Sequence, residues 1–226
     1  MATSAQRLLD REETGMVRLR MSYQEWLDRV DEHAHSEWVD GEVIIYMPPD
    51  QAHQDGELFL ATLLRLFVGM RDLGKIMIAP FEMRLQMVNA SREPDIIFVA
   101  KEHLHRLTTK RLDGPADLAI EMLSKWTASY DRRVKLVEYA RSGIRECWLV
   151  DMRPARRRFE LFVLGDGDRY ESIEPDERGC YHSMVVPGFW VDPRWFDRLP
   201  LPEPVDALME IAGDEFLEMV RARKRD

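Results

Sequence analysis

Two acidic residues in apolar surroundings are the part of this sequence best suited to chemistry. Asp95 follows Pro94 and opens the apolar run 96–99, and Glu121 lies inside the apolar run 118–123. A carboxylate in a covered strand is costly unless a cation or a hydrogen-bond donor compensates it. Carboxylates at one end of a sheet, with water and phosphate oxygens, form the oxygen set that Mg²⁺ prefers. This pattern indicates a site for Mg²⁺ (or Mn²⁺) held by Asp95 and Glu121.

A lysine on the next predicted helix would complete such a site. Helical spacing over 129–142 predicts a buried face, and Lys135 lies at its border. The residues expected on that face are Val134, Leu136, Val137 and Ala140. A lysine at the border can bury its stem and direct its ammonium along the edge of the sheet. There it would hold an attacking water and screen the phosphate.

Each of these three residues also has an ordinary structural interpretation. Asp95 could end a loop, Glu121 could pair with an arginine, and Lys135 could be a solvated helix residue. Spacing alone does not decide between these roles and a metal site, so both interpretations stay open at this stage.

The elements that must position these residues belong to an α/β fold. Continuous apolar runs predict central strands covered on both faces, at 95–99, 118–123 and 147–151. Apolar periodicity predicts helices at 55–70 and 129–142. A turn at 165–168 joins two further strands into a meander at the sheet edge. These patterns indicate a mixed central sheet flanked by helices.

The two ends of the chain differ in character from the middle. We interpret 1–20 as an N-terminal arm, 21–198 as one domain, and 199–226 as a proline-rich linker with a C-terminal helix from Val205 to Arg225. Near the start, Ser22 and Glu25 form a capping-box pattern ahead of a helix reaching about Val30. Asp40-Gly41 predicts a hairpin, because glycine reaches positive φ without a Cβ clash.

The composition limits the classes of function. The 226 residues are 45% apolar, enough for one substantial domain. A net charge of −9 argues against a protein that coats nucleic acid electrostatically. Cys147 and Cys180 are too few for a disulfide framework or a zinc site of their own. No apolar run approaches the roughly 20 residues of a membrane span, and no signal peptide is evident. We expect a cytoplasmic protein with no membrane partner.

Six segments of the chain, in order, carry a resemblance to a known family. They are 36–43, 49–54, 92–99, 114–124, 130–140 and 143–151. Together they resemble the Uma-two family, whose members are assigned as endonucleases of the restriction-endonuclease-like PD-(D/E)XK superfamily. The resemblance runs from about Met21 to Val186. It implies a restriction-endonuclease-like fold, Mg²⁺-dependent hydrolysis of DNA phosphodiester bonds, and DNA as the partner.

The resemblance also implies roles for individual residues. Asp95 would be the aspartate of the Pro-Asp motif and Glu121 the second acid. Leu123 stands where the superfamily has a lysine, and the lysine displaced onto the next helix points to Lys135. Glu37 would be a further acid at the edge of the site, and His53 would orient water or phosphate.

Glu37 and His53 also have purely structural interpretations, and one segment of the chain departs from the family pattern. Glu37 could pair with an arginine on the sheet, and His53 could cap the helix that follows it. The family often has Pro-Ser after Ser124, whereas this chain has Lys125-Trp126. This change near the expected site puts access, and even activity, in question.

Two further functions therefore stand beside the enzyme. One is a nuclease-fold protein that binds nucleic acid without cleaving it. The other is a homo-oligomeric module, with a homodimer as one possibility, that uses the tail from Val205. Four arginines in a turn would contact phosphates or form a solvated turn, and these are Arg153, Arg156, Arg157 and Arg158.

Overall fold

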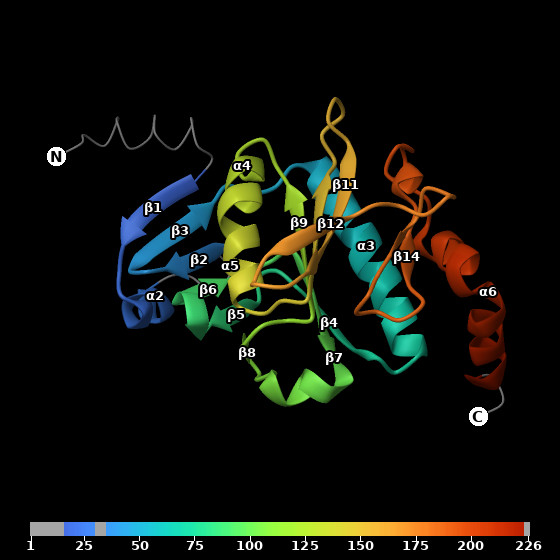
Figure 1. Ribbon diagram of the computed structural model, residues 1–226, viewed down its shortest axis with the longest axis horizontal. Coiled ribbons are helices and arrows are strands. Elements are labelled where there is room, and N and C mark those ends of the chain that lie inside the picture. The colour runs from blue at the N-terminus through green and yellow to red at the C-terminus, as the bar shows by residue number, and fades with distance from the viewer. Residues whose placement is uncertain (1–15, 30–34, 224–226) are drawn as a thin grey trace.

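The middle of the molecule is a six-stranded sheet in the order β12-β11-β10-β9-β7-β4 (Figure 1). The computed structural model describes residues 16–29 and 35–223. The strands are β4 (Gly74–Ile78), β7 (Ile96–Ala100), β9 (Leu118–Leu123), β10 (Glu146–Asp151), β11 (Arg158–Leu164) and β12 (Tyr170–Ile173). Within this sheet, only β9 and β10 are parallel neighbours. Every residue of β7, β9 and β10 is buried. The predicted central strands and edge meander are confirmed.

A second six-stranded sheet, in the order β1-β3-β2-β6-β5-β8, lies beside the first. Its strands are β1 (Met16–Arg20), β2 (Ser36–Val39), β3 (Glu42–Tyr46), β5 (Glu82–Leu85), β6 (Ala90–Arg92) and β8 (Arg111–Asp113). The predicted hairpin joins β2 to β3, with positive φ at Asp40 (47°) and Gly41 (86°). The short 3-10 helices η1 (Gln86–Val88) and η2 (Lys101–Arg106) follow β5 and β7.

The start of the chain differs in part from the expectation. Residues 16–20 were expected in the N-terminal arm, but they form the strand β1, which pairs antiparallel with β3. Residues 1–15 of that arm lie outside the described residues, as does Val30. The capping box is present on α2 (Tyr23–Arg29), where Glu25 accepts from the Ser22 amide at 3.0 Å and the Ser22 hydroxyl accepts from the Glu25 amide at 3.2 Å.

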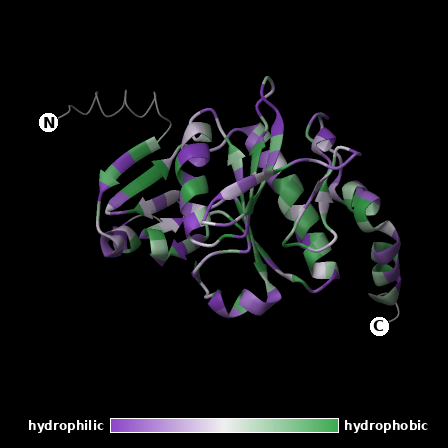
Figure 2. Cartoon of the chain, viewed as in Figure 1, coloured by the Kyte–Doolittle hydropathy of each residue, from purple (hydrophilic) through white to green (hydrophobic). Residues whose placement is uncertain are grey.

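Helices cover the two faces of the central sheet. On one face, the 20-residue helix α3 (Gln51–Met70) packs its apolar side against Leu118, Ile120 and Met122. On the other face, Ala119 and Leu123 pack with Tyr139 of α5 (Leu136–Arg141). Figure 2 shows hydrophobic residues along the central strands and the inner side of α3. Glu121 shares the α5 face, as the strand alternation predicts.

The helical segment before β10 departs from its predicted wheel. It consists of α4 (Ala128–Tyr130), a π-helical turn η3 (Asp131–Lys135) and α5. Its buried residues include Asp131, Lys135 and Tyr139, whereas Val137 is 55% exposed. The predicted apolar face is therefore wrong at Val137. A π turn takes up more residues than an α turn, so it rotates the side chains that follow relative to an ideal wheel.

The C-terminal part of the chain packs on α3. After the short pair β13 (Tyr181–His182) and β14 (Trp190–Val191) come a 3-10 turn η4 (Pro193–Trp195) and α6 (Pro204–Arg223), which is kinked at Ala212. Ala207 and Leu208 of α6 are fully buried, and Arg71, directly after α3, pairs with Glu215 at 2.6 Å. Arg225, the expected end of the last helix, lies outside the described residues. Among the residues described, no helix has the length and apolarity to cross a membrane.

Candidate active site

The two acids singled out in the sequence meet at one end of the central sheet. Strands β7 and β9 are antiparallel, with Ile96 opposite Ile120, so the start of one strand lies beside the end of the other. Asp95 precedes β7, and its Oδ2 accepts the backbone amide of Met122 at 2.6 Å. Asp95 and Glu121 line the same pocket. The first turn of α3 and the loop after β9 lie at this end as well.

Two side chains from the first turns of α3, His53 and Glu57, lie close to Asp95. His53 Nε2 lies 3.5 Å from Asp95 Oδ1, and His53 Nδ1 lies 3.9 Å from Oε2 of Glu57. One ligand atom from each of His53, Glu57 and Asp95 can be chosen so that all lie within 4.8 Å of one another. Asp50, not His53, caps the helix, since its side chain accepts the His53 amide at 2.9 Å. The alternative role of His53 as a cap is therefore wrong.

The donor set of His53, Glu57 and Asp95 fits a divalent metal ion. The Nδ1 atom of His53 is buried and has no hydrogen-bond partner, although it faces a carboxylate. An imidazole nitrogen and two carboxylates suit ions such as Mn²⁺, and carboxylates also suit Mg²⁺. Glu57 was not among the predicted residues. The signal that could have found it is its spacing, because residues four apart on a helix share a face.

Three carboxylates surround the ammonium group of Lys135. Its ammonium is 2.9 Å from Glu121 Oε2, 3.0 Å from Glu37 Oε1 and 3.5 Å from Asp131 Oδ1. The Tyr139 hydroxyl donates to the other oxygen of Glu121. Lys135 is 3% exposed, so the alternative of a solvated helix residue is wrong. Glu121 pairs with this lysine and not with an arginine.

Glu37 lies behind Lys135 and is fully buried on β2. Its Oε2 accepts from Nη1 of Arg92 at 2.7 Å and from the Tyr46 hydroxyl. The expected pairing with an arginine on the sheet is therefore present, together with the contact to Lys135. Glu37 is not among the residues that line the pocket. Its contacts suit a residue that positions Lys135.

Carboxylates outnumber lysines and arginines around Asp95, Glu121 and Lys135, and this excess of negative charge shifts the pKa values of the buried groups. Burial raises the pKa of Glu121 well above its usual range, and Lys135 only partly offsets the effect of burial and of Asp131. Burial and the charge of Asp95 raise the pKa of Glu57 to about 7. Burial alone would lower the pKa of Lys135. The negative charges of Glu121 and Glu37 outweigh the effect of burial, so the pKa of Lys135 is raised well above its usual value.

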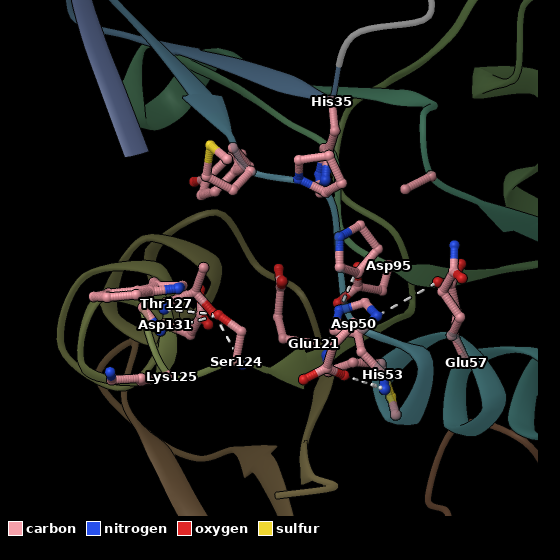
Figure 3. A pocket seen from close by; sticks show the side chains of 18 of the residues that line it. His35, Asp50, His53, Glu57, Asp95, Glu121, Ser124, Lys125, Thr127 and Asp131 are labelled. Carbon is pink, nitrogen blue, oxygen red and sulfur yellow. Dashed lines mark hydrogen bonds and ion pairs between the residues drawn. The ribbon is translucent and has the colours of Figure 1, made fainter. Parts of the chain in front are cut away.

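His53, Glu57, Asp95, Glu121 and Lys135 line a pocket of about 520 Å³. The acids that line it are Asp50, Glu57, Asp95, Glu121 and Asp131, against two lysines, Lys125 and Lys135. Figure 3 shows Asp95, His53 and Glu57 on one side of Glu121, and Ser124, Lys125 and Thr127 on the other. A hollow whose walls carry more negative than positive charge attracts a divalent cation.

The arginine turn between β10 and β11 lies at the same end of the sheet, because β10 runs parallel to β9. Arg153 pairs with Asp151 at 2.5 Å, and Arg157 donates to a backbone oxygen at 3.1 Å. Arg158 lies 3.3 Å from Glu160. Arg156 is exposed, and no side-chain partner is seen for it in the described part of the chain. Arg156 is therefore the member of the turn most available to a phosphate.

Comparison with known proteins identifies the family and the fold of this chain. The model of the Uma2 family, described as "Putative restriction endonuclease", matches residues 21–201. The crystal structure of "a putative nuclease belonging to DUF820" from Anabaena variabilis ATCC 29413 is similar, with a TM-score of 0.61 and 16% identity. That match covers 76% of this chain and 95% of the other. At this identity the likeness shows the fold alone. No curated protein matches the sequence. The predicted family and fold class are confirmed.

Proposed function

We propose that this chain, which belongs to the Uma2 family, is a metal-dependent endonuclease that hydrolyses phosphodiester bonds in DNA. The observation that carries the proposal is the convergence of His53, Glu57 and Asp95 on one point beside Glu121 and Lys135. Mutually repelling carboxylates around a buried unpartnered imidazole nitrogen suit a cation site better than a stabilising core cluster.

His53, Glu57 and Asp95 would hold the ion, with Glu121 as the further acid predicted from the sequence. When bound, Mg²⁺ or Mn²⁺ neutralises charge on the scissile phosphate and lowers the pKa of a water molecule. The amide of Met122 fixes the Asp95 carboxylate by its hydrogen bond of 2.6 Å. A carboxylate held in this way needs no reorganisation to receive its ligand.

Lys135 would act on the same phosphate. Its ammonium borders the pocket and is held by Glu121 and Glu37 at 2.9 and 3.0 Å. From there it can orient the attacking water and stabilise the negative charge that develops in the transition state. Glu37, fixed by Arg92, would be a positioning residue that keeps the lysine charged and directed toward the pocket.

The test is cleavage of plasmid and oligonucleotide DNA with Mg²⁺ or Mn²⁺, comparing the wild type with Asp95→Asn. Asp117→Asn is a matched control, because Asp117 is equally buried and precedes β9 at the far end of the same sheet. We expect Asp95→Asn to lose about 100-fold or more in rate and Asp117→Asn to cleave normally per folded molecule. Equal cleavage by the wild type and Asp95→Asn would refute the proposal.

A second candidate is a nuclease-fold protein that binds nucleic acid without cleaving it. It is favoured by Glu121, whose two oxygens are taken by Lys135 and Tyr139. Calorimetry with MnCl₂ separates the two functions. Metal binding that is lost in Asp95→Asn supports the enzyme, whereas DNA binding without metal binding supports the second candidate.

A further inference from the structure

The loop between β9 and α4 places an exposed aromatic ring at the pocket. Trp126 lines the pocket and is 37% exposed, more than any other tryptophan, tyrosine or phenylalanine in the described residues. The other tryptophans described here contribute to the cores or pack at their edges. Keeping an indole in water forgoes the gain from burial. An exposed ring that lines a pocket is available to a ligand that would cover it.

Hydrogen bonds hold the backbone that carries this ring. The Ser124 hydroxyl accepts the amides of Trp126 and Thr127, both at 3.1 Å. In return, the Thr127 hydroxyl accepts the Ser124 amide at 3.3 Å. A ring on a fixed backbone loses little conformational freedom when a ligand stacks on it.

A cation accompanies the ring. The Lys125 ammonium lies 4.5 Å from the centre of the Trp126 ring, and both side chains are exposed. Because this ammonium lies over one face of the ring, a base would stack on the opposite face, and the cation would contact a phosphate of the same nucleotide. The arginine turn described above has no comparable ring.

The loop faces the metal-ligand candidates across the pocket. In Figure 3, Ser124, Lys125 and Thr127 lie on one side of Glu121, and His53 and Glu57 lie on the other. A pocket of about 520 Å³ is in the range of small-ligand sites. A phosphate held near His53 would therefore have its neighbouring nucleoside inside the pocket that Trp126 lines.

We propose that Trp126 stacks on an unpaired base next to the scissile phosphate, and that the site acts on single-stranded or locally unpaired DNA. This inference rests on the proposed nuclease function. Within a duplex both faces of a base are covered by its neighbours, so stacking on a side chain requires an unpaired or extruded nucleotide. Lys125 would contact the phosphate of that nucleotide.

Binding and cleavage are measured separately to test this. In the Asp95→Asn background, fluorescence anisotropy with labelled single-stranded and duplex oligonucleotides compares Trp126→Ala, Trp126→Leu and Trp126→Phe. Met87→Ala, which also changes an exposed apolar side chain but outside the pocket, is the control. We expect Trp126→Ala and Trp126→Leu to weaken single-strand binding roughly tenfold, with Trp126→Phe close to the parent and duplex binding changed less than about twofold.

Equal loss on both DNA forms, or no loss on the single strand, would overturn the stacking proposal. If the wild type still cleaves DNA in that case, the nuclease function stands alone. Binding that depends on Trp126 without any metal-dependent cleavage would instead uphold the stacking and refute the nuclease. If neither DNA form is bound or cleaved, both proposals fail.

Discussion

Two buried aspartates occupy equivalent places at opposite ends of the strand pair β7–β9. Asp95 precedes β7 and accepts an amide from the end of β9, at Met122. Asp117 precedes β9 and accepts the amide at the end of β7, at Ala100, at 2.7 Å. Each also lies beside a histidine, His53 in one case and His103 in the other. The two carboxylates therefore have the same backbone environment, since each accepts one amide from the end of the neighbouring strand.

Their remaining neighbours differ in charge. Arg145 donates to Asp117 at 2.6 Å, and His103 Nδ1 lies 2.9 Å from the same carboxylate. Asp95 has Glu57 in its surroundings instead, and this acid raises the local negative charge. Asp117 belongs to a satisfied structural cluster, whereas no lysine or arginine pairs with Asp95 in the described part of the chain. The comparison teaches that the balance of donors around an acid, and not its burial, separates a structural carboxylate from a candidate ligand.

The largest effect on stability is expected at the pocket end, from Lys135→Met. It leaves Glu121 and Asp131 without their cation and Glu37 with Arg92 alone, which should cost about 3–5 kcal/mol of unfolding free energy at neutral pH. Arg145→Met is the matched change at the other end. Because the Arg145 side chain is 50% exposed, it should cost about 1 kcal/mol or less. Urea denaturation measures both, and similar losses would break the comparison.

A smaller, pH-dependent effect is expected from Asp117→Asn, at about 1–3 kcal/mol near neutral pH. Burial alone would raise the pKa of Asp117, but the Ala100 amide, His103 and Arg145 lower it below 3.8. The stabilising effect of the ionised carboxylate is therefore complete above that pH. It should vanish as the pH falls through the lower pKa of the folded state. Denaturation curves at a series of pH values check the sign, and a difference that grows in acid would contradict it.

The choice of metal should respond to His53→Gln. A glutamine keeps an oxygen ligand but removes the nitrogen that favours Mn²⁺ over Mg²⁺. We expect affinity for Mn²⁺ to fall about tenfold, with a smaller change for Mg²⁺. Calorimetric titration of both ions measures this. His103→Gln, at the structural end, should leave both affinities unchanged.

The smallest effect is expected from Arg156→Ala on DNA binding. Loss of one phosphate contact at the pocket end should reduce the slope of log affinity against log salt by about 1. Arg141→Ala is the control, because Arg141 is an exposed arginine at the end of α5 toward Asp117. Equal slopes for both variants and the wild type would assign the arginine turn to solvent.

The sequence was sufficient to predict the central strands and the placement of Asp95 and Glu121 at the same end of the sheet, where both line one pocket. Continuous apolar runs mark covered strands, and an acid in such a run is conspicuous. The second sheet was not predicted as a separate layer. Its pairings, such as β2 with β6, join residues far apart in the chain, and no local pattern specifies them.

The candidate site was predicted in part, and the gaps have local causes. Lys135 was placed at the border of an apolar face, but the π turn at 131–135 brings it fully inside with Asp131. A wheel with ideal helical spacing cannot anticipate that turn. Glu57 was overlooked because a charged residue in the first turns of a helix is usually solvated. Only its spacing from His53 distinguished it.

The most direct test of the central claim is diffraction from crystals soaked in MnCl₂, recorded at a wavelength where manganese scatters anomalously. The account predicts an anomalous peak in the pocket, within about 2.0–2.6 Å of ligand atoms from His53, Glu57 and Asp95, and none beside Asp117. No peak in the pocket, or a peak that avoids all three residues, would contradict the assignment of this cluster as the metal site.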